Sequence, residues 1–98
     1  KENAASLPDA TLDAAFLINV LFQNKAWVGI LKEATRLLKP HGKLLVVEWK
    51  STGAPFAPPP SLRIAEGAVE DMAQSLHLTP LDHFSAGRYH YGIIFEKQ

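Results

Sequence analysis

The sequence predicts an α/β fold with parallel strands and a carboxyl-terminal antiparallel hairpin. Two apolar runs without polar alternation, Ala14–Leu21 and Leu44–Val47, are typical of strands covered on both faces, as in a parallel sheet flanked by helices. A stretch with helical periodicity separates them, which gives the strand–helix–strand order of a right-handed crossover unit. Two further apolar stretches near the carboxyl terminus, joined by a short turn, indicate the hairpin.

Composition excludes several classes of protein. The 98 residues are 47% hydrophobic and 20% charged, as in ordinary soluble globular domains. Ten basic residues balance ten acidic ones without a basic stripe, so no nucleic-acid partner is expected. The chain has no cysteine, and its four histidines lack metal-ligand spacing, so no metal site is expected. Without a long apolar run or a signal peptide, we expect a cytoplasmic protein with no membrane contact.

The chain begins with a polar stretch, Lys1–Pro8, which we interpret as a loop. Residues 8–11, Pro-Asp-Ala-Thr, have the composition of a turn. The strand Ala14–Leu21 follows, and Asn19 interrupts it near its end. Asn19 is equally compatible with closing the strand and with facing a ligand.

A helix is predicted after the polar link that contains Asn24, a residue able to cap it. Pro40 cannot continue a helix, so the helix should end at Lys39. Gly42 lies where a φ above zero is expected, directly before the strand Leu44–Val47. The helix carries an apolar stripe at helical spacing, formed by Trp27, Ile30, Leu31, Ala34, Leu37 and Leu38.

A proline-rich segment, Ser51–Pro60, follows this strand and favours an extended path. It is placed either to cover a site or to act as a plain connector. A second helix is predicted over Ile64–Leu76, because its apolar residues share one face. The hairpin strands are predicted at Leu78–Phe84 and Tyr89–Glu96, around an Ala-Gly turn at residues 86–87.

Four stretches carry a resemblance to a known family: LPDATLDA at 7–14, FLINVL at 16–21, LKEATRLLKPHGKLLVVEWK at 31–50 and YHYGIIFEK at 89–97. In this order they resemble the fourth strand with its entry loop, the following helix, turn and fifth strand, and the last strand of a class I S-adenosylmethionine (SAM)-dependent methyltransferase. The group is methyltransferase type 11, or ubiquinone-biosynthesis-like, and His41 stands for the first glycine of its Leu-Lys-Pro-Gly-Gly turn. The resemblance implies a partial Rossmann-like methyltransferase fold, with residues 1–98 forming the carboxyl-terminal half of a domain.

The resemblance also implies SAM as cofactor. Asn3 and Ala4 match the loop position that contacts adenine, and Ile18 and Asn19 would lie by the sulfonium through backbone and side chain. The family holds the amino-acid part of SAM on a Gly-x-Gly-x-Gly loop, but the glycines here are at 29, 42, 53, 67, 87 and 92. We therefore expect either a fragment or a half-domain, which by itself binds SAM weakly or not at all.

Five side chains should meet at the edge where ligands bind in open α/β sheets. Glu48 and Trp49 end one strand, while Tyr89, His90 and Tyr91 begin the antiparallel last strand at the same edge. Trp49, Tyr89 and Tyr91 are candidates for lining an acceptor pocket under the proline-rich segment. His90 and Glu48 are the candidate catalytic groups, since an imidazole or a carboxylate can take a proton from the acceptor. An ordinary histidine at the rim remains the alternative for His90.

Two functions from different classes follow. The first is the substrate-side half of a SAM-dependent methyltransferase acting on a small molecule. The alternative is a non-catalytic, stand-alone module that dimerises. A dinucleotide-binding oxidoreductase half would fit the sheet, but its glycine fingerprint is absent from the sequence.

The first strand also predicts association. Without a neighbour on its outer side it would be a sheet edge with no charge and no proline, a pattern that favours pairing with another chain. We expect a homo-oligomer, most simply a two-fold dimer through Phe16, Ile18 and Val20 or their neighbours on the opposite face of the strand, or coverage by an upstream half.

Overall fold

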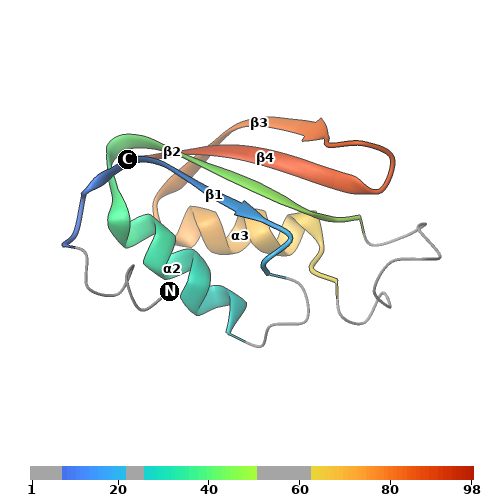
Figure 1. The fold of residues 1–98 in the computed structure, drawn as a ribbon, viewed down its shortest axis with the longest axis horizontal. Coiled ribbons are helices and arrows are strands. Elements are labelled where there is room, and N and C mark those ends of the chain that lie inside the picture. The colour runs from blue at the N-terminus through green and yellow to red at the C-terminus, as the bar shows by residue number, and fades with distance from the viewer. Residues whose placement is uncertain (1–7, 22–25, 51–62) are drawn as a thin grey trace.

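The computed structural model describes residues 8–21, 26–50 and 63–98, which form a sheet with helices beneath it (Figure 1). The expectations for Asn24 and for Ser51–Pro60 lie outside these residues. The order strand, helix, strand, helix, hairpin agrees with the sequence prediction. The elements are β1 (Leu12–Ile18), α2 (Trp27–Leu37), β2 (Leu38–Trp49), α3 (Glu66–Ser75), β3 (Leu78–Ser85) and β4 (His90–Lys97).

The four strands form one sheet in the order β1-β2-β4-β3. β1 and β2 pair in parallel, as the crossover unit requires, whereas β4 is antiparallel to both β2 and β3. The predicted hairpin is confirmed, and its turn contains Gly87 at φ 94°. The fold is therefore α/β, with one parallel pair in a mostly antiparallel sheet, and β1 lies at one edge.

The helices cover one face of this sheet. Leu44 and Val46 are fully buried, whereas their neighbours Leu45 and Val47 are only half-buried. Figure 1 shows the reason, since α2 and α3 lie on the same side of the sheet. The expectation of strands buried on both faces is therefore wrong for the described residues. The side that neither α2 nor α3 covers is named the open face, and it carries Phe16, which is 69% exposed.

The core lies between the helices and the covered face. α2 contributes Leu31 and Ala34, and α3 contributes Val69 and Ala73. Burial of each such aliphatic side chain contributes about 1.5–3 kcal/mol of transfer free energy. The contact between the helices and the sheet is therefore a large favourable term in folding. From the strands and their connections come Leu21, Leu38, Leu44, Val46, Leu78, Tyr91, Ile93 and Phe95.

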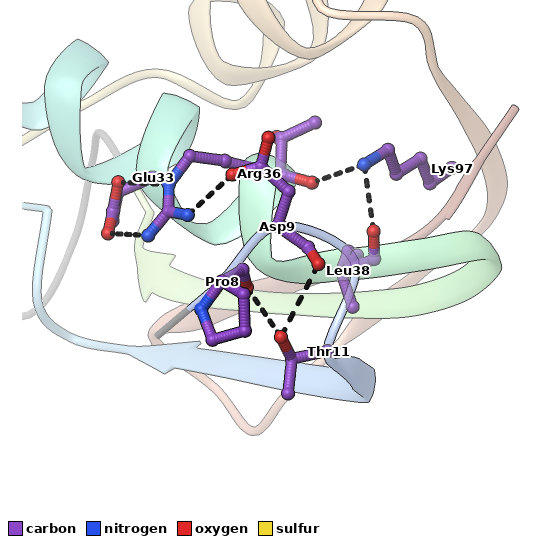
Figure 2. Close-up of polar contacts among 8 residues, drawn as sticks. Pro8, Asp9, Thr11, Glu33, Arg36, Leu38 and Lys97 are labelled. Atoms are coloured by element: carbon purple, nitrogen blue, oxygen red, sulfur yellow. Dashed lines mark hydrogen bonds and ion pairs between the residues drawn. The ribbon is translucent and has the colours of Figure 1, made fainter. Parts of the chain in front are cut away.

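α2 ends at Leu37, two residues before the predicted end, and the chain enters β2 at once. Leu38 already has extended backbone angles and pairs with Leu12 of β1. The ammonium group of Lys97 donates to the carbonyls of Thr35 at 2.9 Å and Leu38 at 2.7 Å (Figure 2). The Thr35 carbonyl also accepts the backbone N–H of Leu38, so the ammonium group adds a second hydrogen bond at the end of α2. A cation at this end of a helix interacts favourably with the helix dipole.

The first part of β2 differs from the predicted turn. His41, not Gly42, has the positive φ, at 69°. Gly42 is required for space instead, because a Cβ there would lie 2.9 Å from the carbonyl oxygen of Lys39 and 3.1 Å from that of Asp13. The chain thus needs a glycine here because backbone oxygens of both β2 and β1 leave no room for a side chain.

Candidate functional site

The predicted site residues on β2 and β4 lie at one edge of the sheet. Trp49 pairs with His90 and Glu48 pairs with Tyr91 across the two strands. β1 ends beside them, since Ile18 pairs with Val47. We call this region the carboxyl edge; it comprises Asn19, Glu48, Trp49, Tyr89, His90 and Tyr91.

Strand alternation divides the carboxyl edge between two faces. Glu48 and Tyr91 are buried on the covered face, in line with the other buried residues of their strands. Trp49 and His90 lie on the open face, with ring centroids 4.1 Å apart and planes inclined at 36°. The structure thus brings Trp49 together with His90 and Glu48 together with Tyr91. It does not bring the two candidate catalytic groups, Glu48 and His90, to a common face.

Glu48 is fully buried and bonds to the chain that follows β1. Its Oε2 accepts a hydrogen bond from the backbone N–H of Leu21 at 2.7 Å. The backbone N–H of Asn19 donates to the carbonyl of Val47 at 2.8 Å. The segment Asn19–Leu21 is therefore bonded to β2 near both of its ends. Sequence reasoning missed the contact to Leu21, because a pattern of apolar residues does not reveal which backbone amide a carboxylate meets.

Two polar atoms at the carboxyl edge are available to a ligand. Asn19 Oδ1 and His90 Nε2 are buried and have no hydrogen-bond partner among the described residues. Buried polar atoms in proteins nearly always have a partner, so these two are suited to exchange hydrogen bonds with a bound molecule. Asn19 has φ 56°, a conformation that asparagine tolerates better than most residues. Its neighbour Ile18 is 51% exposed and adds an apolar surface.

The two tyrosines have different surroundings. The Tyr91 hydroxyl donates to the carbonyl of Ile64 at 2.7 Å, which ties the segment before α3 to the sheet. Burial raises the pKa of Tyr91, and the nearby carboxylates of Glu48 and Glu66 raise it further, so the phenol keeps its proton. Tyr89 is half-buried, and the guanidinium carbon of Arg88 lies 5.9 Å from the centre of its ring.

Arg63 is a second residue that sequence reasoning missed. Its Nη1 donates to the carbonyl of Lys50 at 3.0 Å, just beyond β2. Lys50 in turn donates from its backbone N–H to the carbonyl of Tyr89 at 2.8 Å and from Nζ to Ser85 Oγ at 3.1 Å. A lone arginine before a helix has no sequence pattern that predicts such a contact.

Some of the expectations concern residues that the structure does not describe, and others can be compared with the described residues only. Asn3, Ala4 and the proline-rich segment lie outside the described residues. Within the parts of the chain that are described, no three or more His, Asp or Glu side chains gather as metal ligands would. Among the same residues, no helix has the length and apolar character needed to cross a membrane.

Comparison with known families and solved structures finds methyltransferases. The model of a family described as a methyltransferase domain matches residues 1–46. A SAM-dependent methyltransferase from Aquifex aeolicus superposes with a TM-score of 0.86 at 24% identity, over 100% of this chain and 52% of that one. A protein from Sulfolobus solfataricus assigned to the type 11 methyltransferases has a TM-score of 0.83 at 21% identity, over 97% and 56%.

A third structure shares the fold and contains ligands. It is the 1,6-didemethyltoxoflavin-N1-methyltransferase of Burkholderia thailandensis with 1,6-didemethyltoxoflavin and S-adenosylhomocysteine bound, and its TM-score is 0.73 at 19% identity, over 97% and 48%. No curated protein matches the sequence significantly. The chain spans about half the length of these solved structures, so it has the fold of part of such a domain.

Proposed function

Because this chain has the fold of part of a class I SAM-dependent methyltransferase domain, we propose that it is the carboxyl-terminal, substrate-facing half of a methyltransferase acting on a small molecule. The observation that carries the proposal is the coincidence of two findings. The family match covers β1, α2 and most of β2. Asn19 Oδ1 and His90 Nε2, the buried polar atoms proposed to meet a ligand, lie where β1 and β2 end and β4 begins.

The residues at the carboxyl edge fit SAM as the cofactor. Asn19 Oδ1 is a buried acceptor that has no partner among the described residues, and SAM carries ammonium and hydroxyl donors. Ile18 offers apolar contact beside it, and Asn3 and Ala4 are the proposed contacts to adenine. When bound, SAM supplies a methyl group on a sulfonium, so the protein mainly has to align the acceptor and accept any proton it loses.

His90 is the proposed proton acceptor and Trp49 the proposed acceptor platform. The Trp49 indole packs against the His90 ring, and the buried His90 Nε2 makes no hydrogen bond to any residue that the structure describes. In one neutral tautomer this nitrogen accepts a proton from an N–H or O–H of the acceptor. Tyr89 is the further proposed pocket residue on the strand entry. Tyr91 is proposed to support the pocket through Ile64 instead of contacting the substrate directly.

A second candidate function is a non-catalytic module that dimerises. It is favoured by the exposed apolar side chains of Phe16, Ile18 and Val20 along the β1 edge. Such a module would have no use for Asn19 Oδ1 as an acceptor. The two functions therefore differ in whether the carboxyl edge binds a ligand at all.

A fusion protein tests the proposal. The amino-terminal half of the Aquifex aeolicus protein, placed before Lys1, supplies the cofactor-binding half that we propose this chain lacks. We expect the folded fusion to bind S-adenosylhomocysteine in isothermal titration calorimetry. Asn19→Ala should weaken binding about tenfold, the value of one buried hydrogen bond, whereas the control Thr35→Val, which alters a buried hydroxyl within α2, should not. Equal affinity of the Asn19→Ala and parent fusions would contradict the proposed contact.

A further inference from the structure

The buried carboxylate of Glu48 makes a long-range contact that a catalytic base would not need. Glu48 is 0% exposed, and its Oε2 accepts from the N–H of Leu21, a residue 27 positions earlier, at 2.7 Å. Burying a carboxylate is costly unless hydrogen bonds compensate. A bond from an N–H to a carboxylate is about twice as strong as one between neutral groups, so this contact fixes the Leu21 amide firmly.

The segment held by this contact is the one that presents Asn19. At its start, the Asn19 N–H donates to the Val47 carbonyl at 2.8 Å; at its end, Leu21 is bonded to Glu48 and is itself 0% exposed. Val20 between them is 44% exposed. The hydrogen bond from Asn19 is accepted by a backbone carbonyl, whereas the one from Leu21 is accepted by a side chain. Only the second bond therefore depends on which residue occupies position 48.

We propose that Glu48 is a positioning residue: its carboxylate holds the turn Asn19–Leu21 so that the amide oxygen of Asn19 faces the ligand at the carboxyl edge. The identity of that ligand as the cofactor rests on the proposed function; the positioning itself does not. Glu48 acts through Leu21 and Asn19, and its side chain lies on the covered face, away from the face that carries His90.

The proposal predicts what each substitution does. Glu48→Leu removes the acceptor and leaves the Leu21 N–H buried without a partner, so the turn opens to water and Asn19 loses its fixed orientation. Glu48→Gln keeps a carbonyl oxygen of the same reach and should restore most of the contact. Thr35→Val is the matched control, because it also alters a buried polar side chain but in α2, where Thr35 Oγ1 donates to Leu31 at 2.8 Å.

Amide hydrogen exchange of the 98-residue chain, followed by NMR, tests the contact directly. We expect the Leu21 amide to exchange at least about tenfold faster in Glu48→Leu than in the parent, and to recover in Glu48→Gln. The Asn19 amide, bonded to the backbone of Val47, serves as an internal reference and should change little. Equal Leu21 exchange in the parent and Glu48→Leu, or an equal acceleration in Thr35→Val, would overturn the proposal.

The order of the Asn19 side chain is the second readout, and a merely stabilising residue would not change it. The heteronuclear NOE of the Asn19 side-chain amide should be high in the parent and in Glu48→Gln, and low in Glu48→Leu. If Glu48→Leu does not fold, Glu48→Gln decides: the Leu21 amide proton should move upfield when the charged acceptor becomes neutral, and an unchanged resonance overturns the proposal. Failure of the fusion to bind S-adenosylhomocysteine would reject the proposed function and leave these ligand-free measurements unaffected.

Discussion

The rings of Trp49 and His90 lie against each other across β2 and β4, with centroids 4.1 Å apart. They are direct partners in the antiparallel register and share the open face. Cross-strand aromatic pairs of this kind stabilise a sheet as well as shaping its surface. At this position the pair also aligns a buried imidazole nitrogen with the region proposed for the acceptor.

Two substitutions of His90 distinguish the contribution of its ring contact to stability from that of its ring nitrogens. His90→Ala should lower the free energy of unfolding by about 0.5–1 kcal/mol through loss of the cross-strand contact. His90→Phe keeps a ring and should remain close to the parent. Urea denaturation followed by Trp49 fluorescence, in a Trp27→Phe background, measures both. Equal stability of all three proteins would show that the ring contact contributes nothing.

Two adjacent residues in the first part of β2, His41 and Gly42, should respond to substitution in opposite ways. Gly42→Ala should destabilise the protein by about 1–3 kcal/mol, because the new methyl group meets the carbonyl oxygens of Lys39 and Asp13. His41→Gly should stabilise it by up to about 1 kcal/mol, since a non-glycine residue with positive φ is strained. Thermal unfolding of the two variants checks this, and a stabilising Gly42→Ala would contradict the structure.

A histidine on β3 should make stability depend on pH. His83 Nδ1 lies 2.7 Å from Glu66 Oε2, and its Nε2 lies 3.5 Å from Glu70 Oε2. The hydrogen bond to Glu66 raises the pKa of His83, although desolvation opposes it and the charges of both carboxylates add to the increase. The pKa is higher in the folded state, so the contribution is complete below the ordinary value and is lost as pH rises through the folded-state value.

For this exposed group we expect a contribution of at most about 1 kcal/mol. We would measure unfolding at about pH 5.5 and about pH 8.5. The parent should exceed His83→Gln in unfolding free energy by more at the lower pH than at the higher one. Glu66→Gln removes the principal partner of His83. In a Glu66→Gln background, the effect of His83→Gln on the unfolding free energy should therefore depend less on pH. A difference that grows with pH would have the wrong sign and would reject this assignment.

The β1 edge predicts association of the isolated chain. Phe16, Ile18 and Val20 are 69%, 51% and 44% exposed, and within the described residues β1 has a partner strand on one side only. Exposed apolar edges of this kind favour pairing with a second chain. Light scattering should give a mass above the 10.8 kDa of one chain.

Charge substitutions locate the interface. Ile18→Lys should return the mass to that of one chain or unfold the protein. Leu81→Lys, on the other edge strand and equally exposed at 50%, is the matched control and should leave the assembly intact. A folded monomer for the parent chain, or equal dissociation by Leu81→Lys, would contradict association through β1.

The sequence predicts the helices and strands of this fold better than it predicts which of their faces are buried. Helical spacing identified α2, and alternation with a glycine turn identified the β3–β4 hairpin, because both signals are local. The apolar run 44–47 predicted a strand but not its environment, since Leu44 and Val46 are fully buried whereas Leu45 and Val47 are only half-buried. The same letters are compatible with a strand covered on either one face or both.

The candidate site was predictable in position but not in arrangement. Topology placed Glu48 and His90 at one edge, and the structure agrees. Their separation onto opposite faces depends on register, and the contact of Glu48 with Leu21 depends on tertiary packing. No pattern near residue 48 encodes a partner 27 positions away.

Titration with S-adenosylhomocysteine tests the central claim most directly. We expect the folded 98-residue chain to show no binding in the low-micromolar range, because many contacts to the cofactor would come from a glycine-rich half that its sequence lacks. The folded fusion carrying that half should bind with one-to-one stoichiometry and should lose affinity when Asn19 is replaced by alanine. Low-micromolar binding by the chain alone, or no binding by the folded fusion, would contradict the account.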